Sequence, residues 1–225
     1  MATAGSVSSS TMARPRTPKG RARRTHERLA ETFPDAECEL DHRNAFELLA
    51  ATILSAQATD VSVNKASPAL FERFPTAADL AAVTPEDVEP YINSIGLFRS
   101  KAKNLVGMAQ RLIDEFDGEV PGSMKDLTSL PGVGRKTANV VRSVALGLPG
   151  LPVDTHVGRI VRRLHITDET DPVKVELALN PMIPAGERGE FSLRVILHGR
   201  RVCFARNPDC GSCVLADFCP SVGTG

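Results

Sequence analysis

Apolar residues recur at helical spacing along most of the chain. Between Phe98 and Phe116 they stand at positions 98, 102, 105, 106, 109, 112, 113 and 116, which places them on one face of a helix. Apolar runs over 45–54, 138–146 and 157–164 indicate further helices, and a first helix is predicted over about 21–33. No hairpin turn is flanked by alternating segments, so the predicted fold class is all-α.

Helix start signals stand ahead of several of these segments. A capping residue followed three positions later by an acid occurs at Asn44/Glu47, Thr76/Asp79, Thr84/Asp87 and Ser123/Asp126. Asp171 precedes Pro172, and proline is favoured at the first helical position. Each pair predicts a helix that begins one residue after its cap. The loop FPDAECELDHR after the first helix would let that helix pack against the far end of the chain.

Length and composition set broad limits. The 225 residues can form one large domain or two modest ones, and 42% hydrophobic content is ample for a core. No apolar run approaches the length of a membrane span, and no signal-peptide core is present. We therefore expect no membrane association and a cytoplasmic location.

Basic charge is concentrated at the N-terminus. Residues 1–28 hold seven Lys or Arg against one acid, whereas the other 197 residues carry 20 bases and 26 acids. Residues 1–20 lack Leu, Ile and aromatic side chains and are predicted to form a disordered basic tail. A mitochondrial transit peptide is the alternative, but Pro15, Pro18 and the missing apolar face disfavour an import helix.

The nonapeptide LPGVGRKTA (130–138) predicts a glycine-bracketed hairpin. Gly132 and Gly134 allow tight turns and close approach of another molecule, and the amides around Val133 and Arg135 would face outward at a helix N-terminus. Such an array binds anions, phosphates above all. The alternative is an ordinary helical corner in which Lys136 stands by chance.

Four cysteines lie within 17 residues near the C-terminus. Cys203, Cys210, Cys213 and Cys219 follow the spacing C-x6-C-x2-C-x5-C. In a chain without secretory features this spacing favours a metal centre over disulfides. A [4Fe–4S] cluster fits better than zinc, because one of the intervals alone has the CxxC spacing of zinc sites. Cys38 stands apart and is interpreted as a small buried apolar residue.

Taken together, these motifs resemble the endonuclease III family, bacterial DNA glycosylases with AP lyase activity in the helix–hairpin–helix superfamily. The resemblance is carried by LPGVGRKTA, VDTHVGR (153–159), ILSAQATDVSVNKA (53–66), ILHGR (196–200) and the cysteine spacing, and it covers about residues 22–220. It implies two helical domains that flank a DNA-binding cleft. One would be a six-helix barrel over 38–148, and the other a [4Fe–4S] cluster domain over 21–37 plus 149–225.

The resemblance also implies catalytic roles. Lys136 matches the family nucleophile, which expels a damaged base, forms a Schiff base with the sugar and cuts the strand by β-elimination. Asp154 matches the aspartate that stabilises charge on the sugar and assists proton transfer. Lys136 could instead contact a phosphate, and Asp154 could also cap the helix that follows it. Oxidised pyrimidines are the implied substrates.

Further DNA contacts follow from the same comparison of motifs. Gln57 matches the residue that fills the space left by the extruded base, and Leu97 matches a wedge that enters the opposite strand. The hairpin Gly132, Val133, Gly134 and Arg135 would hold the DNA backbone, and His156 would support the site or contact DNA. Leu97 could instead fill the core, and a purely structural His156 is an equal alternative. The implied partner is double-stranded DNA with damaged bases or abasic sites, bound by a monomer at the nucleoid.

The loop between the first two C-terminal cysteines departs from the family pattern, in which it is typically basic, and three other functions compete with the one implied. The loop 204–209 reads FARNPD, with Arg206 as its one base, so weaker phosphate contact is expected there and the basic tail could supply some affinity. Adenine-mismatch and thymine-mismatch glycosylases are disfavoured by Lys136. A DNA-binding module without catalysis would use the hairpin for phosphate contact alone.

Overall fold

The computed structural model describes residues 14–224, and within that range all regular structure is helical, which confirms the all-α class. The elements are α1 (Pro18–Thr32), α2 (Ala45–Leu54), α3 (Asp60–Arg73), α4 (Ala77–Ala81), α5 (Pro85–Ile92), α6 (Phe98–Phe116), α7 (Met124–Ser129), α8 (Arg135–Val144), α9 (Thr155–Arg163), α10 (Pro172–Leu179), the 3-10 helix η1 (Ala185–Glu187) and α11 (Arg188–Arg201). None of the described helices is both long and apolar enough to cross a membrane.

The buried apolar residues form two separate clusters. The first runs from Leu40 to Val141 and is built by α2 to α8, with α6 packed against α2, α4 and α5. The second joins residues of α1 with residues from Leu151 to Phe218. Helices α8 and α11 pack against each other where the two clusters meet.

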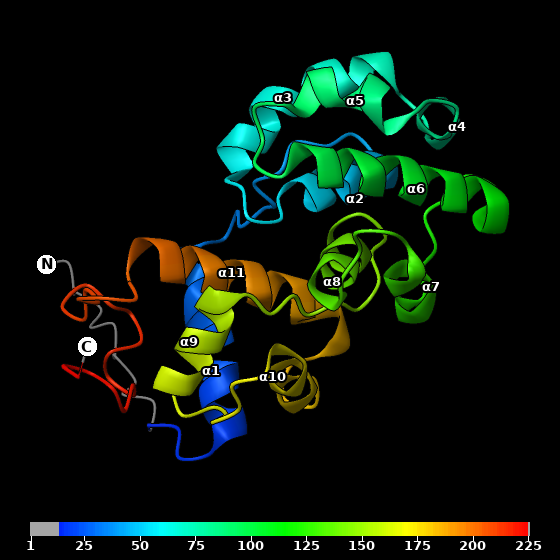
Figure 1. Cartoon of the computed structure of the whole chain (residues 1–225). Helices are drawn as coiled ribbons and strands as arrows, with labels where there is room; N and C mark the ends of the chain where they lie inside the picture. The colour runs from blue at the N-terminus through cyan, green and yellow to red at the C-terminus, as the bar shows by residue number, and fades with distance from the viewer. Residues whose placement is uncertain (1–13, 225) are drawn as a thin grey trace, which may run out of the picture.

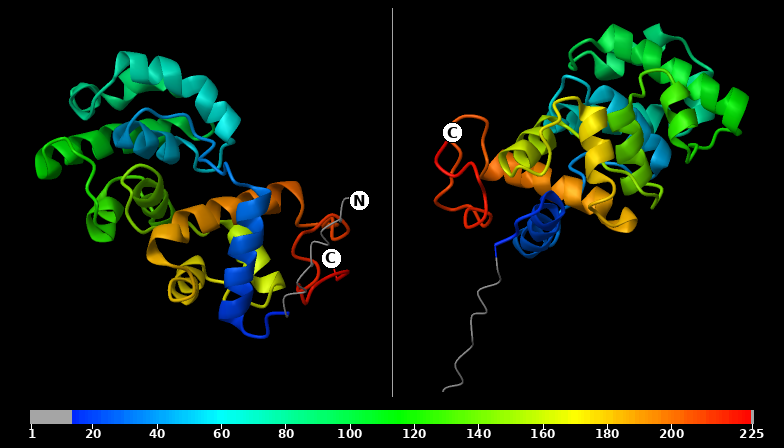
Figure 2. Two further views of the ribbon diagram at one scale, coloured as in Figure 1. Left: turned by 180° about the vertical axis from the view of Figure 1, so that it is seen from behind. Right: turned by 90° about the horizontal axis from the view of Figure 1, so that it is seen from below.

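Helix α1 packs with the far end of the chain (Figures 1 and 2). It lies against α11, and Leu29 is fully buried in the second cluster. Arg28 donates to the carbonyl of Val214 at 2.9 Å and to Asp217 at 3.0 Å. The expectation that the loop after the first helix permits this long-range contact is therefore confirmed.

The start of α1 differs from the prediction. The helix begins at Pro18, so residues 18–20 do not belong to a disordered tail. The Thr17 hydroxyl accepts from the Gly20 amide at 3.1 Å, and Pro18 occupies the first helical position, so a capped start stands inside the basic segment. Residues 1–13, which make up most of the predicted tail, lie outside the described residues.

Local caps set most of the other helix boundaries. Asn44, Ser123 and Asp171 accept hydrogen bonds from first-turn amides, and Thr76 with Asp79 forms a full capping box. At α2 the reciprocal bond differs from the predicted one: the Glu47 carboxylate accepts from the amide of Arg43 at 2.7 Å. The predicted boundaries of the helices at 45–54 and 98–116 are confirmed.

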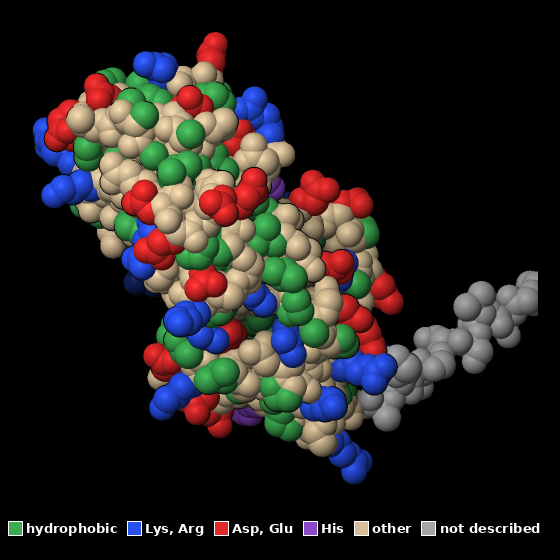
Figure 3. All heavy atoms as spheres, turned by 90° about the vertical axis from the view of Figure 1, so that its right-hand side faces the viewer, with side chains coloured by type: hydrophobic (Ala, Val, Ile, Leu, Met, Phe, Trp, Pro, Cys, Tyr) green, Lys and Arg blue, Asp and Glu red, His purple; other side chains and the backbone are tan. Residues whose placement is uncertain are grey.

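Charge is mixed on the surface that Figure 3 shows, where acidic and basic side chains stand side by side among apolar ones. The overall formal charge of zero agrees with such a surface. A protein without net charge can still bind a charged partner through local groups.

Candidate active site and iron–sulfur loop

The segment between α7 and α8 is a tight turn held by its own backbone. The amide of Val133 donates to the carbonyl of Leu130 at 3.1 Å, and Gly132 adopts φ +77°. A Cβ at Gly132 would lie 2.9 Å from the Cβ of Asn104 on α6. Both the conformation and the close packing therefore require glycine at this position.

Val133 has a packing role in this turn. Its side chain is buried in the first cluster, and its amide is already used within the turn. Helix α8 then begins at Arg135, and its N-cap residue, Gly134, supplies no side-chain cap. Its first amides thus keep the free N–H groups that favour an anion, and Val133 offers no side chain or amide for this purpose.

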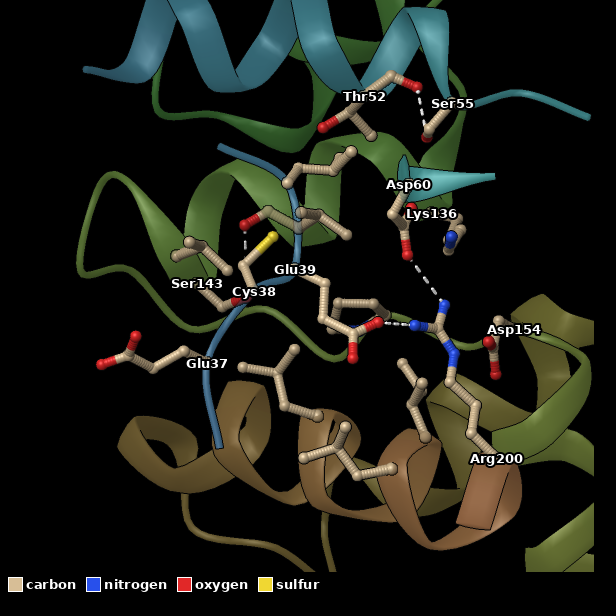
Figure 4. Close-up of a pocket in the computed structure, with 17 residues that line it drawn as sticks. Glu37, Cys38, Glu39, Thr52, Ser55, Asp60, Lys136, Ser143, Asp154 and Arg200 are labelled. Atoms are coloured by element: carbon tan, nitrogen blue, oxygen red, sulfur yellow. Dashed lines mark hydrogen bonds and ion pairs between the residues drawn. The ribbon is translucent and has the colours of Figure 1, made fainter. Parts of the chain in front are cut away.

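Lys136 and Asp154 line the same pocket, which lies between the two clusters (Figure 4). Lys136 is the second residue of α8, and its side chain is exposed. Asp154 precedes α9, and its Oδ1 accepts from the amide of Val157 at 2.9 Å. The prediction that Asp154 caps a helix is confirmed, and within the described residues its second carboxylate oxygen has no hydrogen-bond partner.

The pocket also contains an ion-pair network that the sequence analysis did not assign. Arg200 of α11 pairs with Glu39, which lies between α1 and α2, and its Nη2 lies 3.0 Å from Asp60 at the start of α3. Figure 4 shows these side chains at the end of the pocket that holds Lys136 and Asp154. Asp60 and Arg200 both lie in segments that carry the family resemblance, ILSAQATDVSVNKA and ILHGR. Their place in these segments is the one feature of the sequence that could have marked them as site residues.

Cys38 lies on the wall of this pocket and is half-buried, so the interpretation as a buried core residue was only partly right. Burial raises the pKa of its thiol, and a backbone hydrogen bond with Leu40 acts in the opposite direction. Leu193, Ile196 and Leu197 of α11, with Val140 and Val144 of α8, supply much of the apolar lining.

Gln57 and Leu97 are both exposed, and both have a left-handed backbone. Gln57 has φ 54° in the turn after α2, and Leu97 has φ 60° immediately before α6, with 62% of its surface exposed. Leu97 is therefore not a core residue. A left-handed conformation is unfavourable for residues with a Cβ, and such outliers cluster at functional sites.

Arg135 is engaged within the protein. Its Nε and Nη2 donate to the two carboxylate oxygens of Glu176 on α10, at 2.7 and 2.8 Å. The hydrogen bonds with Glu176 raise the pKa of Arg135. The positive charge beside Lys136 is consequently compensated by the Glu176 carboxylate.

His156 packs against α11. A Cβ at Gly199 would lie 2.8 Å from the Cβ and from Nδ1 of His156, and Arg159 Nη2 lies 3.0 Å from that same Nδ1. These contacts support the structural alternative for His156.

The four C-terminal cysteines line one small pocket together with Arg163. Among the described residues, no three Cys, His, Asp or Glu converge closely enough to hold a single metal ion. Four thiols that line one pocket are the donor set of a [4Fe–4S] cube, whose irons each take one thiolate.

Arginines of α9 hold the segment that enters this loop. Arg163 Nη1 lies 3.2 Å from the sulfur of Cys203 and also donates to the carbonyl of Phe204 at 2.6 Å. Arg159 Nη2 donates to the carbonyl of Cys203 at 2.9 Å. Burial raises the pKa of the Cys213 thiol to about 11. Cluster binding must therefore displace a proton from this thiol.

Comparison with known proteins agrees with this geometry. Residues 50–185 match the family described as HhH-GPD superfamily base excision DNA repair protein. Residues 203–219, which begin and end at the outer cysteines, match the iron–sulfur binding domain of endonuclease III. The class is therefore a helix–hairpin–helix enzyme of base excision repair with an iron–sulfur domain.

Individual proteins similar to this chain are endonuclease III enzymes. Endonuclease III of Synechocystis sp. is 51% identical over 194 residues, which are 86% of this chain and 89% of that protein. The Escherichia coli (strain K12) enzyme is 44% identical over 192 residues, 85% of this chain and 91% of that protein. A non-covalent endonuclease III–DNA complex superposes with a TM-score of 0.84 at 47% identity, covering 90% of this chain and 95% of that one.

The chain belongs to the endonuclease III family. It is a bifunctional DNA glycosylase and AP lyase of base excision repair, and its C-terminal domain holds a [4Fe–4S] cluster. A thermostable thymine-DNA glycosylase superposes with a TM-score of 0.82, covering 91% of this chain and 98% of that one, but at 22% identity this likeness concerns the fold alone.

Proposed function

We propose that Lys136 is the nucleophile of this enzyme and that Asp154 is the carboxylate that assists it. The observation that carries the proposal is their position in one pocket, on the first turn of α8 and at the N-cap of α9. One oxygen of Asp154 accepts from the amide of Val157, which holds the carboxylate in place, and within the described residues the other oxygen has no hydrogen-bond partner, so it is available to the substrate.

The chemistry divides into two stages. The neutral amine of Lys136 bonds to C1′ of the nucleotide as the C1′–N bond breaks, and the base leaves with the bonding electrons and gains a proton. The sugar ring opens to give a Schiff base, and loss of a proton from C2′ then expels the 3′ phosphate. Asp154 stabilises positive charge on the sugar and relays protons in both stages.

We propose double-stranded DNA with oxidised pyrimidines or abasic sites as the substrate. The uncapped amides at the start of α8, together with Gly132 and Gly134, bind a phosphate of the damaged strand. The damaged base leaves the stack, Gln57 occupies its place and Leu97 enters the opposite strand. Their exposed, left-handed positions support these roles.

We propose that the two hydrophobic clusters correspond to two domains, 38–148 and 21–37 with 149–225, and that DNA lies between them. The catalytic pocket has walls from both. The protein acts as a monomer. Cys203, Cys210, Cys213 and Cys219 bind the cluster, which when bound cross-links the C-terminal loop.

A panel of duplexes tests the substrate class. Single-turnover cleavage is measured on DNA with thymine glycol, 5-hydroxycytosine, an abasic site, 8-oxoguanine opposite cytosine, or a thymine mismatch. We expect efficient cleavage of the first three. Faster cleavage at 8-oxoguanine or at the mismatch would contradict the proposed specificity.

A further inference from the structure

A buried carboxylate on α10 connects to the helix that bears Lys136. Glu176 is 5% exposed, and both of its oxygens accept from Arg135. Glu176 lies on α10 next to Val175 and Leu179, which are buried in the second cluster, whereas Arg135 directly precedes Lys136 on α8. The ion pair therefore anchors the first turn of α8 to the second cluster.

Asn139 extends this connection toward Asp154. It is 3% exposed and lies one turn after Arg135 on α8. Its Nδ2 donates to Glu176 Oε2 at 2.9 Å, and its Oδ1 accepts from the amide of Leu151 at 3.1 Å. Leu151 opens the buried stretch Leu151–Val153 that leads into Asp154. The Asn139 side chain thus bonds both to Glu176, which holds the start of α8, and to Leu151, in the segment that leads to Asp154.

Packing leaves this segment little freedom. A Cβ at Gly150 would overlap the carbonyl oxygen of Asn139, so the backbone here lies directly on α8. On the opposite side the buried hydroxyl of Ser192 on α11 donates to the carbonyl of Pro152. The chain between Gly150 and Asp154 is therefore held from both sides.

We propose that Glu176 and Asn139 are positioning residues that set the separation between Lys136 and Asp154. This inference rests on the proposed catalytic roles of those two residues. Glu176 fixes the start of α8 through Arg135. Asn139 fixes the segment Leu151–Val153, which leads to Asp154, relative to that start. Neither side chain touches the substrate.

The energetics favour a positioning role over simple stabilisation. Burying a carboxylate costs desolvation energy, and apolar residues of similar volume often stabilise a core as well as a buried ion pair does. The ionic network instead fixes the relative positions of α8 and α10, because each oxygen of Glu176 accepts from a donor on α8. Reaction rates respond steeply to displacements of about 1 Å, so loss of this fixed geometry should affect catalysis more than folding.

The test uses Glu176→Gln and Asn139→Ala in the full-length, cluster-loaded protein. Both Glu176 oxygens face N–H donors, so the glutamine places an NH2 group against a donor. We measure the single-turnover rate of Schiff-base formation on an abasic duplex by borohydride trapping. We also measure Kd for a duplex with a tetrahydrofuran abasic analogue, which cannot react, as well as thermal unfolding and absorbance near 400 nm.

A matched control comes from α2. Glu47 is also buried and paired with an arginine, since Arg43 Nε donates to Glu47 Oε1 at 2.8 Å, but it does not line the catalytic pocket. We expect Glu176→Gln and Asn139→Ala to lower the trapping rate about 30-fold with Kd changed by less than about threefold. Glu47→Gln should lower thermal stability comparably and leave the rate within about twofold.

Exchange of the two groups provides a partial rescue. In the double variant Asn139→Asp with Glu176→Gln, the new amide at position 176 donates to the new carboxylate at position 139, which still accepts from Leu151, and the remaining oxygen at position 176 still accepts from Arg135 Nη2, but the bond from Arg135 Nε is lost. We expect it to recover only part of the lost rate. Equal rate losses for Glu176→Gln and Glu47→Gln would overturn the inference. An adduct formed by Lys136→Ala would instead overturn the proposed nucleophile, whatever the other variants do.

Discussion

Asp154 Oδ1 accepts a hydrogen bond from the backbone N–H of Val157 at 2.9 Å, so the carboxylate proposed for catalysis is also the N-cap of α9. The two roles are compatible, because a helix N-terminus favours an ionised carboxylate. They are also separable, because asparagine caps helices about as well as aspartate but carries no charge.

This separation gives a first prediction. Asp154→Asn should change the free energy of unfolding by less than about 1 kcal/mol, since the capping bond survives. The same variant should lower the single-turnover glycosylase rate about 10²–10⁴-fold, because a proton-transfer group is lost. Asp154→Ala should lose the activity and, in addition, about 1 kcal/mol of stability.

Denaturant unfolding and excision kinetics on the same preparations check both effects. Thr76→Ala is the control, because Thr76 caps α4 away from the pocket and its loss should reduce stability alone. A nearly fully active Asp154→Asn variant would show that the carboxylate serves α9 only.

A second prediction concerns backbone strain at Leu97. Glycine adopts φ 60° without strain, so Leu97→Gly should leave stability unchanged or raise it by up to about 1 kcal/mol. Excision from duplex DNA should nevertheless fall about tenfold, because the wedge that holds the kinked duplex is gone. Asp117 has φ 52° at the other end of α6 and is the matched control. Asp117→Gly should give the same stability effect at full activity, and a loss of activity there would argue against a specific role for Leu97.

A third prediction follows from the Arg200 network. Arg200→Ala leaves Glu39 and Asp60 without their shared cation in the pocket. These carboxylates then repel DNA phosphates, so Kd for abasic-analogue DNA should rise about 5–10-fold at low salt and less at high salt. Arg23→Ala removes the same charge from an exposed pair on α1 and should have a much smaller effect. Equal changes in both variants would mean that net charge alone matters.

Removal of the cluster should affect α1 as well as the cysteine loop. Arg28 of α1 bonds to Val214 and Asp217 inside that loop, so a disordered loop releases the helix. Hydrogen exchange should speed up in Pro18–Thr32 and 203–219 of the apo-protein, while Phe98–Phe116 stays protected. Unchanged protection of α1 beside an open loop would contradict this coupling.

Local signals predicted much of this fold from sequence. The caps at Asn44, Ser123 and Asp171 and the period of 98–116 depend on residues three or four positions apart, and the structure agrees with them. The start of α1 was missed because a basic composition outweighed the Thr17–Pro18 cap. Composition reports the ability to form a core, not the presence of a capped helix that packs on a distant one.

The site was predicted less completely, because its electrostatics are long-range. Arg135 meets Glu176 41 positions away, and Arg200 meets Asp60 140 positions away. No period or spacing in the sequence encodes such pairs. The motif resemblance predicts that Val133 contacts DNA with the rest of the hairpin, whereas its side chain is buried in the first cluster. Motif membership located the pocket, and tertiary packing decided which of its residues are available to a ligand.

In the proposed mechanism the amine of Lys136 becomes covalently bonded to the damaged sugar. The most direct measurement is borohydride trapping on an abasic duplex, followed by mass-spectrometric mapping of the modified peptide. We predict one adduct, mapped to Lys136, which is absent from Lys136→Ala and undiminished in Lys103→Ala, where an exposed lysine of α6 is removed. An adduct mapped to another residue, or one that persists in Lys136→Ala, would contradict the account.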